Sequence, residues 1–160
     1  MKSEMHRRPA IPSEHNRTLL FAILMGGAAA GVLDLASAFI TFGWSVPRAI
    51  ASGLLGARAL HGGLTTWILG VLLHFLIAFS AATVYCLSSG KLEFLKSHFL
   101  ICGVFYGIAV FLVMNLIVLP LSAVPWHIGP FPLRNLIRGL LVHMVLIGLP
   151  ISLSARKWLT

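Results

Sequence analysis

The side chains that could do chemistry in this chain are few, and they lie inside long apolar stretches. The four candidates are Asp34, His74, Asn115 and His143. A carboxylate in hydrocarbon costs about 2.5–3.5 kcal/mol even on a lenient scale, so Asp34 should face other helices and find a polar partner. Histidine changes its charge near neutral pH. Asp34 paired with His74 or His143 would therefore form a titratable couple, suited to a proton-linked path or a small-solute site.

Two other interpretations of these residues stay open. One is a structural network, in which Asp34 is hydrogen-bonded to a histidine and Asn115 bridges helices, because interhelical hydrogen bonds hold membrane helices together. The other is haem b, with His74 and His143 as axial ligands that each follow a glycine by one turn. A second outer pair, His61 and His127, lies where glycines and prolines interrupt the helices that would carry it.

Composition predicts the elements that must position these residues. Hydrophobic residues fill 58% of the 160 positions and charged residues only 10%, whereas a soluble domain carries about 25% charged residues. Four apolar stretches come close to the roughly 20 residues that a bilayer requires. We therefore predict an all-α bundle of four transmembrane helices in one domain, residues 18–157, after a flexible tail at 1–17. The predicted helices are 18–42, 64–87, 99–119 and 136–154.

Orientation follows from the basic residues, which lie in short clusters between the apolar runs and not on a nucleic-acid-binding surface. With the N-terminus inside, eight face the cytoplasm: Lys2, Arg7, Arg8, Arg17, Lys91, Lys96, Arg156 and Lys157. Four remain outside: Arg48, Arg58, Arg134 and Arg138. The positive-inside rule then predicts that both termini are cytoplasmic, in a bacterial inner membrane. Cys86 and Cys102 lie near the cytoplasmic leaflet and are predicted to be free thiols.

The four outer arginines allow two interpretations. They could snorkel to the interface or contact phospholipid, or they could form an anion-attracting mouth for a lipid headgroup or a small organic acid. Arg48 and Arg58 lie in the segment 44–63, whose apolar content and N-capping Ser45 predict a helix at the outer interface. The segment 120–132 holds four prolines, so it cannot be a continuous helix.

Glycine spacing predicts both helix packing and an internal repeat. The first and third helices carry GxxxG, and the second and fourth carry GxxxH, which together predict a parallel two-plus-two repeat about the membrane normal. The alternative is chance, because glycine and leucine are abundant in membrane helices. Asn115 lies about a third of a turn away from the glycine face of its helix. The glycines predicted to pack against neighbouring helices are Gly27, Gly31, Gly70, Gly103, Gly107 and Gly139.

Several short motifs are together similar to a widespread family of uncharacterised four-helix bacterial inner-membrane proteins. They are IASGLLG at 50–56, LHF at 73–75, YG at 106–107, MN at 114–115 and LPLSA at 119–123. The resemblance covers most of residues 20–157, and its most specific part runs from Asn115 to Ala123. The family has no assigned activity, so the resemblance implies the architecture and leaves the function open.

Motifs of soluble enzymes are missing from the sequence. It holds no GxSxG, HExxH, CxxC, P-loop or Rossmann pattern. Of four acidic residues only Asp34 lies in a predicted span, which excludes paired-carboxylate chemistry within one chain. We expect a small transport or permeation protein, oligomeric, with its polar site open to the outside. The alternatives are a haem-binding redox subunit and a structural or assembly partner of a larger membrane complex.

Overall fold

The computed structural model describes residues 14–126 and 132–160, and every regular element in these ranges is helical. The first and second long helices are α1 (Glu14–Phe42) and α3 (Leu64–Lys91). The third is built from α5 (Phe99–Val113), η2 (Met114–Val118) and α6 (Leu119–Leu121). The fourth is built from α7 (Leu133–Val142), η3 (His143–Gly148) and α8 (Leu149–Leu159).

All four long helices have the length and composition needed to cross a membrane, and this fits a multi-pass membrane protein. The spans are Asn16–Phe42, Leu64–Lys91, Phe99–Leu121 and Leu133–Leu159. They confirm the predicted all-α class and the four predicted spans. Helix α1 begins at Glu14 and not at Thr18, because an acidic residue in the first turn favours a helix N-terminus. The rest of the predicted tail, residues 1–13, lies outside the described residues.

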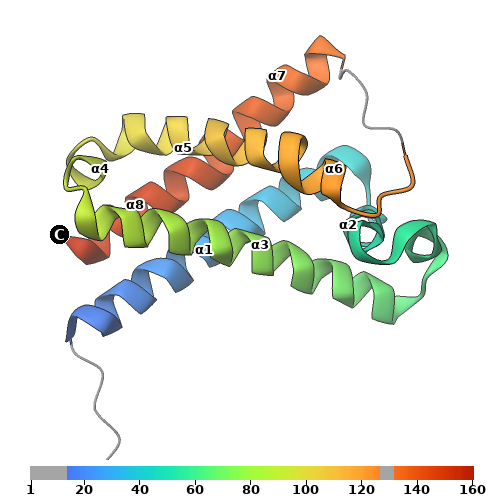
Figure 1. Ribbon diagram of the computed structural model, residues 1–160, viewed down its shortest axis with the longest axis horizontal. Coiled ribbons are helices and arrows are strands. Elements are labelled where there is room, and N and C mark those ends of the chain that lie inside the picture. The colour runs from blue at the N-terminus through green and yellow to red at the C-terminus, as the bar shows by residue number, and fades with distance from the viewer. Residues whose placement is uncertain (1–13, 127–131) are drawn as a thin grey trace, which may run out of the picture.

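The four long helices run up and down in chain order, with α2 at one end of the bundle and α4 at the other (Figure 1). We call the end where α1 finishes and α3 begins the α2 end, and the opposite end, where the C-terminus lies, the α4 end (Figure 1). Helix α1 packs on α3 and α8, while α5 packs on η3 and α8. The fourth helix therefore joins the two halves of the chain.

Both the third and the fourth helices contain a π-helical segment shortly before a proline. The segment η2 precedes Pro120, and η3 precedes Pro150. Proline has no backbone N–H and its ring crowds the carbonyl four residues earlier, so the preceding turn widens. In a membrane, such local adjustment is how a helix accepts proline. Neither α1 nor α3 contains proline, and both are α-helical throughout.

At the α2 end, a short helix covers the start of α3. Helix α2 (Val46–Leu55) follows Ser45, which takes the predicted N-cap position without a side-chain cap bond, and η1 (Gly56–His61) leads on to α3. A Cβ added to Gly70 would lie 1.8 Å from the Pro47 carbonyl oxygen, so only glycine permits this close approach. The backbone N–H of Ala123 donates to Gly53 O at 2.8 Å, which joins the chain after α6 to α2.

Toward the α4 end the helices pack tightly around small side chains. Tyr85 Oη donates to Leu95 O at 3.0 Å, and Tyr106 Oη donates to Ala81 O at 2.6 Å. The short helix α4 (Phe94–Ser97) connects α3 to α5 there. Cys86 is buried, and both Cys86 and Cys102 are free thiols, as predicted. The buried core consists of Ala22, Ala30, Ala82, Tyr85, Cys86, Ile147, Ile151 and Ala155.

Candidate functional site

Three of the four predicted polar residues line one small cavity inside the bundle. Asp34 comes from α1, His74 from α3 and His143 from the start of η3, and the cavity measures about 100 Å³. Each of the three side chains is half-buried. The remaining walls are small or apolar: Ala30, Gly31, Ile50, Ile77, Ala78, Ala81, Val110, Met114 and Ile147. Three ionisable groups from three helices therefore share one space in the middle of the predicted spans.

The imidazole of His74 bonds to a neighbouring helix. Its Nε2 lies 2.9 Å from Gly31 O on α1. Because a carbonyl oxygen only accepts hydrogen bonds, Nε2 must carry the hydrogen, and in the neutral ring Nδ1 is then unprotonated. The ring also meets Phe75 edge-on, with centroids 5.6 Å apart. His74 thus holds α3 against α1 at the wall of the cavity.

The imidazole of His143 bonds within its own helix. Its Nδ1 lies 2.9 Å from Gly139 O, one turn earlier, so Nδ1 carries the hydrogen. Across residues 14–126 and 132–160, Nε2 has no hydrogen-bond partner. Phe111 of α5 packs edge-on against the ring at a centroid distance of 5.2 Å. The free nitrogen of His143 therefore belongs to a ring whose position is fixed on two sides.

Asp34 faces the cavity, as its cost in hydrocarbon predicts. No donor from the described part of the chain bonds its carboxylate, and it interacts electrostatically with His143. A space of this size has room for water, which needs only about 10–15 Å³ of such volume per molecule together with polar partners. Water in this cavity could therefore hydrate the Asp34 carboxylate.

Asn115 is the predicted polar residue that the structure places apart. Its Nδ2 donates to Phe111 O at 2.8 Å, within the same helix, and its side chain does not line the cavity. The bridge between helices that the structural interpretation assigns to Asn115 is thus not formed. Its neighbour Met114 lines the cavity instead. The offset of about a third of a turn between Asn115 and the glycine face of its helix already indicated that its side chain lies apart from the other polar residues.

The glycines of both GxxxG motifs pack against the long helix that follows them in the chain. A Cβ on Gly27 or Gly31 would meet the rings of Phe79 and Phe75 on α3. A Cβ on Gly107 would lie 2.4 Å from His143 O, and one on Gly103 would lie 2.3 Å from Ser152 Oγ. The first pair of helices is therefore separated by aromatic rings, whereas at Gly107 the second pair meets backbone to backbone.

The GxxxH glycines do not have matched surroundings. Gly70 packs on the Pro47 backbone of α2, whereas a Cβ on Gly139 would lie 2.6 Å from the Phe111 ring of α5. Gly70 in the first half of the chain is thus covered by a short helix, and Gly139 in the second half is covered by an aromatic side chain. The contacts between glycine and histidine also differ, because Gly31 O accepts a hydrogen bond from the His74 ring, whereas Gly107 lies against the backbone carbonyl of His143. The two-plus-two repeat stays a prediction.

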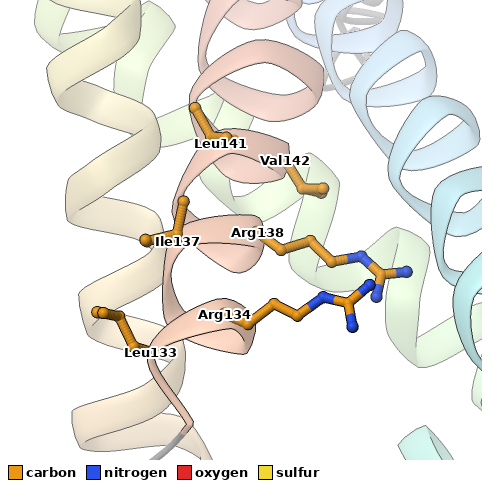
Figure 2. A pocket seen from close by; sticks show the side chains of 6 residues that line it. All are labelled: Leu133, Arg134, Ile137, Arg138, Leu141 and Val142. Carbon is orange, nitrogen blue, oxygen red and sulfur yellow. The ribbon is translucent and has the colours of Figure 1, made fainter.

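The four arginines predicted to lie outside fall on different elements. Arg138 on α7 reaches α1, where Nη2 donates to Thr41 Oγ1 and the guanidinium lies 5.7 Å from the Phe42 ring centroid. Arg134 extends beside it from the same helix (Figure 2). Arg48 is half-buried on α2 with an unpartnered Nε, and Arg58 is exposed on η1. Only Arg134 and Arg138 line one common surface.

The cavity does not fit the haem interpretation. At about 100 Å³ it is smaller than the roughly 300–1,000 Å³ of pockets for drug-sized ligands, and the Nε2 of His74 is occupied by Gly31 O. Of the proposed second pair, His61 is exposed on η1 and His127 lies outside the described residues. Within the described ranges, no group of three or more His, Cys, Asp or Glu residues is placed to bind a metal ion.

Sequence reasoning missed an aromatic cluster at the α2 end. Trp44 stacks on Phe39 with centroids 4.5 Å apart and on Trp67 at 5.4 Å. The Nε1 of Trp67 donates to Trp44 O at 3.0 Å. Aromatic residues near the ends of two predicted spans were the available signal, because tryptophan gathers at membrane interfaces. The cluster joins the end of α1 to the first turn of α3.

Comparisons with protein-family models, with curated proteins and with solved structures found no match to this chain. Its function must therefore be inferred from the cavity and its surroundings.

Proposed function

We propose that this chain is a small proton-translocating or proton-coupled membrane protein, in which the cavity between Asp34, His74 and His143 forms the central part of the path. The observation that carries the proposal is the convergence of three ionisable side chains from three helices on one cavity. Ionisable residues within membrane spans mark ion and proton pathways by default, because their burial is costly. The distribution of basic residues supports an inner-membrane location with both termini cytoplasmic.

The hydrogen bonds of these residues favour a proton path over a structural network. His74 and His143 each bond to a backbone carbonyl, and neither is hydrogen-bonded to Asp34. A structural network would instead be expected to satisfy the carboxylate with these donors, because an unpaired buried charge is expensive. Asp34 and the Nε2 of His143 are thus the two groups left available for exchange with water.

The size of the cavity favours a proton over an organic solute. About 100 Å³ accommodates a few water molecules at roughly 30 Å³ each. A proton taken up at Nε2 would make His143 an imidazolium. Its transfer through water to Asp34 would restore the neutral ring and leave a protonated carboxyl group, so charge and protons balance.

Protein residues lie on both sides of the cavity along the bundle. Ile50 of α2 forms the wall toward the α2 end. Toward the α4 end lie the buried Ala82 and Tyr85, and Tyr106 bonded to Ala81 O.

The test is proton uptake by proteoliposomes that contain a trapped pH-sensitive dye, driven by a potassium diffusion potential. The intact protein should acidify the lumen faster than empty liposomes do. Asp34→Asn keeps the shape of the side chain but cannot ionise, so uptake should fall about a hundredfold, the usual contribution of a positioned proton-transfer group.

Ser37→Ala is the matched control, because it removes a polar group from the same helix that does not line the cavity. It should leave uptake unchanged. Uptake no faster than in empty liposomes, or equal uptake by Asp34→Asn and the intact protein, would overturn the proposal.

A further inference from the structure

The exposed side of α7 carries a second feature that the proton path does not use. A shallow hollow of about 560 Å³ runs along this one helix. It is lined by Leu133, Arg134, Ile137, Arg138, Leu141 and Val142. In Figure 2 the two arginines extend side by side from one edge of α7, while Leu133, Ile137 and Leu141 form an apolar stripe along the other edge. We infer that this surface binds an anionic phospholipid, with its phosphate on Arg134 and Arg138 and an acyl chain along the apolar stripe.

No acidic side chain in the described part of the chain neutralises the charge of these two arginines. Within residues 14–126 and 132–160, the only ion pair joins Lys96 to Glu93 near the α4 end. Arg134 makes no hydrogen bond to the described part of the chain, and Arg138 bonds only to the hydroxyl of Thr41. Two guanidinium groups one turn apart present paired donors, a geometry that suits phosphate.

The depth of these side chains matches that of a phospholipid. The span Leu133–Leu159 has 27 residues, about 40 Å of helix at 1.5 Å per residue, and the hydrocarbon core is about 30 Å thick. The first turns of α7 therefore lie at headgroup level. Arg134 and Arg138 lie in the first two turns of α7, and Leu141 and Val142 follow deeper in the bilayer. A phosphate at the arginines would leave its acyl chain pointing along the apolar residues.

The described part of the chain leaves the apolar stripe at least half exposed. Leu133 is 69% exposed, Ile137 50% and Leu141 52%. Helix α7 packs against α5, and Arg138 reaches α1, while Figure 1 shows the first turns of α7 projecting beyond the neighbouring helices. In a bilayer an acyl chain is the natural occupant of such a surface. This inference does not depend on the proposed proton path.

The test is non-denaturing mass spectrometry of the purified full-length protein in a neutral detergent, titrated with phosphatidylglycerol or with phosphatidylcholine of the same acyl chains. The intact protein should bind phosphatidylglycerol more tightly. A basic residue near anionic lipid contributes about 1 kcal/mol, or about a fivefold change in affinity. Arg134→Gln should therefore weaken binding about fivefold, and Arg134→Gln with Arg138→Gln about 25-fold.

Arg58→Gln is the matched control, because it removes one exposed arginine from η1 at the same end of the bundle. It should leave the affinity unchanged. Leu141→Ala should weaken lipid binding several-fold by shortening the acyl contact. Inorganic phosphate should not displace the lipid; displacement would indicate a site for the free ion. Equal losses in Arg58→Gln and Arg134→Gln, or full affinity in the double variant, would overturn the inference.

Discussion

His74 and His143 each follow a glycine by four residues, yet their rings bond to different helices. His74 reaches across to Gly31 O on α1, whereas His143 turns back to Gly139 O on its own helix. The first bond connects two helices and occupies Nε2. The second only orients the ring and leaves Nε2 without a partner in the described part of the chain. One histidine is thereby suited to holding the bundle together and the other to exchanging a proton.

The backbone conformation around the two histidines also differs. Helix α3 continues as a regular α-helix through His74, while His143 opens the π-helical segment before Pro150. A π-helical turn shifts the positions of the side chains around it and is frequent at functional sites. Gly31, whose carbonyl accepts the His74 bond, faces phenylalanine rings. Gly107, which lies against His143, faces backbone. The histidine in the first half of the chain thus lies in a regular α-helix, whereas the histidine in the second half lies in a π-helical segment.

The largest effect should come from the glycines that face the two histidines. In Gly107→Ala the new Cβ would lie 2.4 Å from His143 O and 2.6 Å from Met144 Cα. Backbone cannot move aside as a side chain can, so we expect a loss of about 3 kcal/mol or more in the free energy of unfolding. In Gly31→Ala the nearest atoms belong to the Phe75 ring, which can rotate, and about 1 kcal/mol should be lost.

Unfolding of both variants in mixed micelles, followed by circular dichroism, measures this difference. Gly43→Ala is unsuitable as a control, because Gly43 has a positive φ of 79°. Gly90→Ala is suitable, because nothing lies within 4 Å of its new Cβ. Equal destabilisation of Gly107→Ala and Gly31→Ala would show that the two helix pairs approach each other alike.

The next effect separates the two histidines by function. His143→Gln removes the free Nε2, so proton uptake by proteoliposomes should fall about a hundredfold, with little change in stability. His74→Ala removes the bond to Gly31 O, so about 1 kcal/mol of stability should be lost. His74→Gln restores an N–H donor and should recover part of that loss. If His74→Gln abolishes uptake while His143→Gln preserves it, the roles are reversed.

The sequence was sufficient to predict the four spans because each is a long apolar run between polar segments. It also predicted that Asp34 faces other helices and lies near His74 or His143, and these three residues line the cavity. Helical periodicity separated Asn115 from the glycine face, and its side chain indeed bonds within its own helix.

The hydrogen bonds of the two histidines could not be predicted in this way. Gly70-x-x-x-His74 and Gly139-x-x-x-His143 have the same spacing, so the direction of each ring depends on its rotamer and on which backbone lies nearby. That backbone is set by distant residues: Pro47 packs on Gly70, and Phe111 packs beside Gly139. The position of Arg138 has a similar cause, because its guanidinium bonds to Thr41, a residue distant in sequence at the end of α1.

The smallest effect is expected for Asn115, a polar side chain that bonds to neither His74 nor His143. Its amide donates to Phe111 O, and the Phe111 ring in turn packs against His143. Asn115→Ala removes a half-buried bond within one helix, which contributes about 0.5 kcal/mol or less in a membrane. Uptake should be unchanged, because the side chain does not line the cavity. The measurements are the unfolding and proteoliposome assays used for the histidine variants. A fall in uptake with stability intact would mean that Phe111 transmits the change to His143, and the site would then extend beyond the cavity into the third helix.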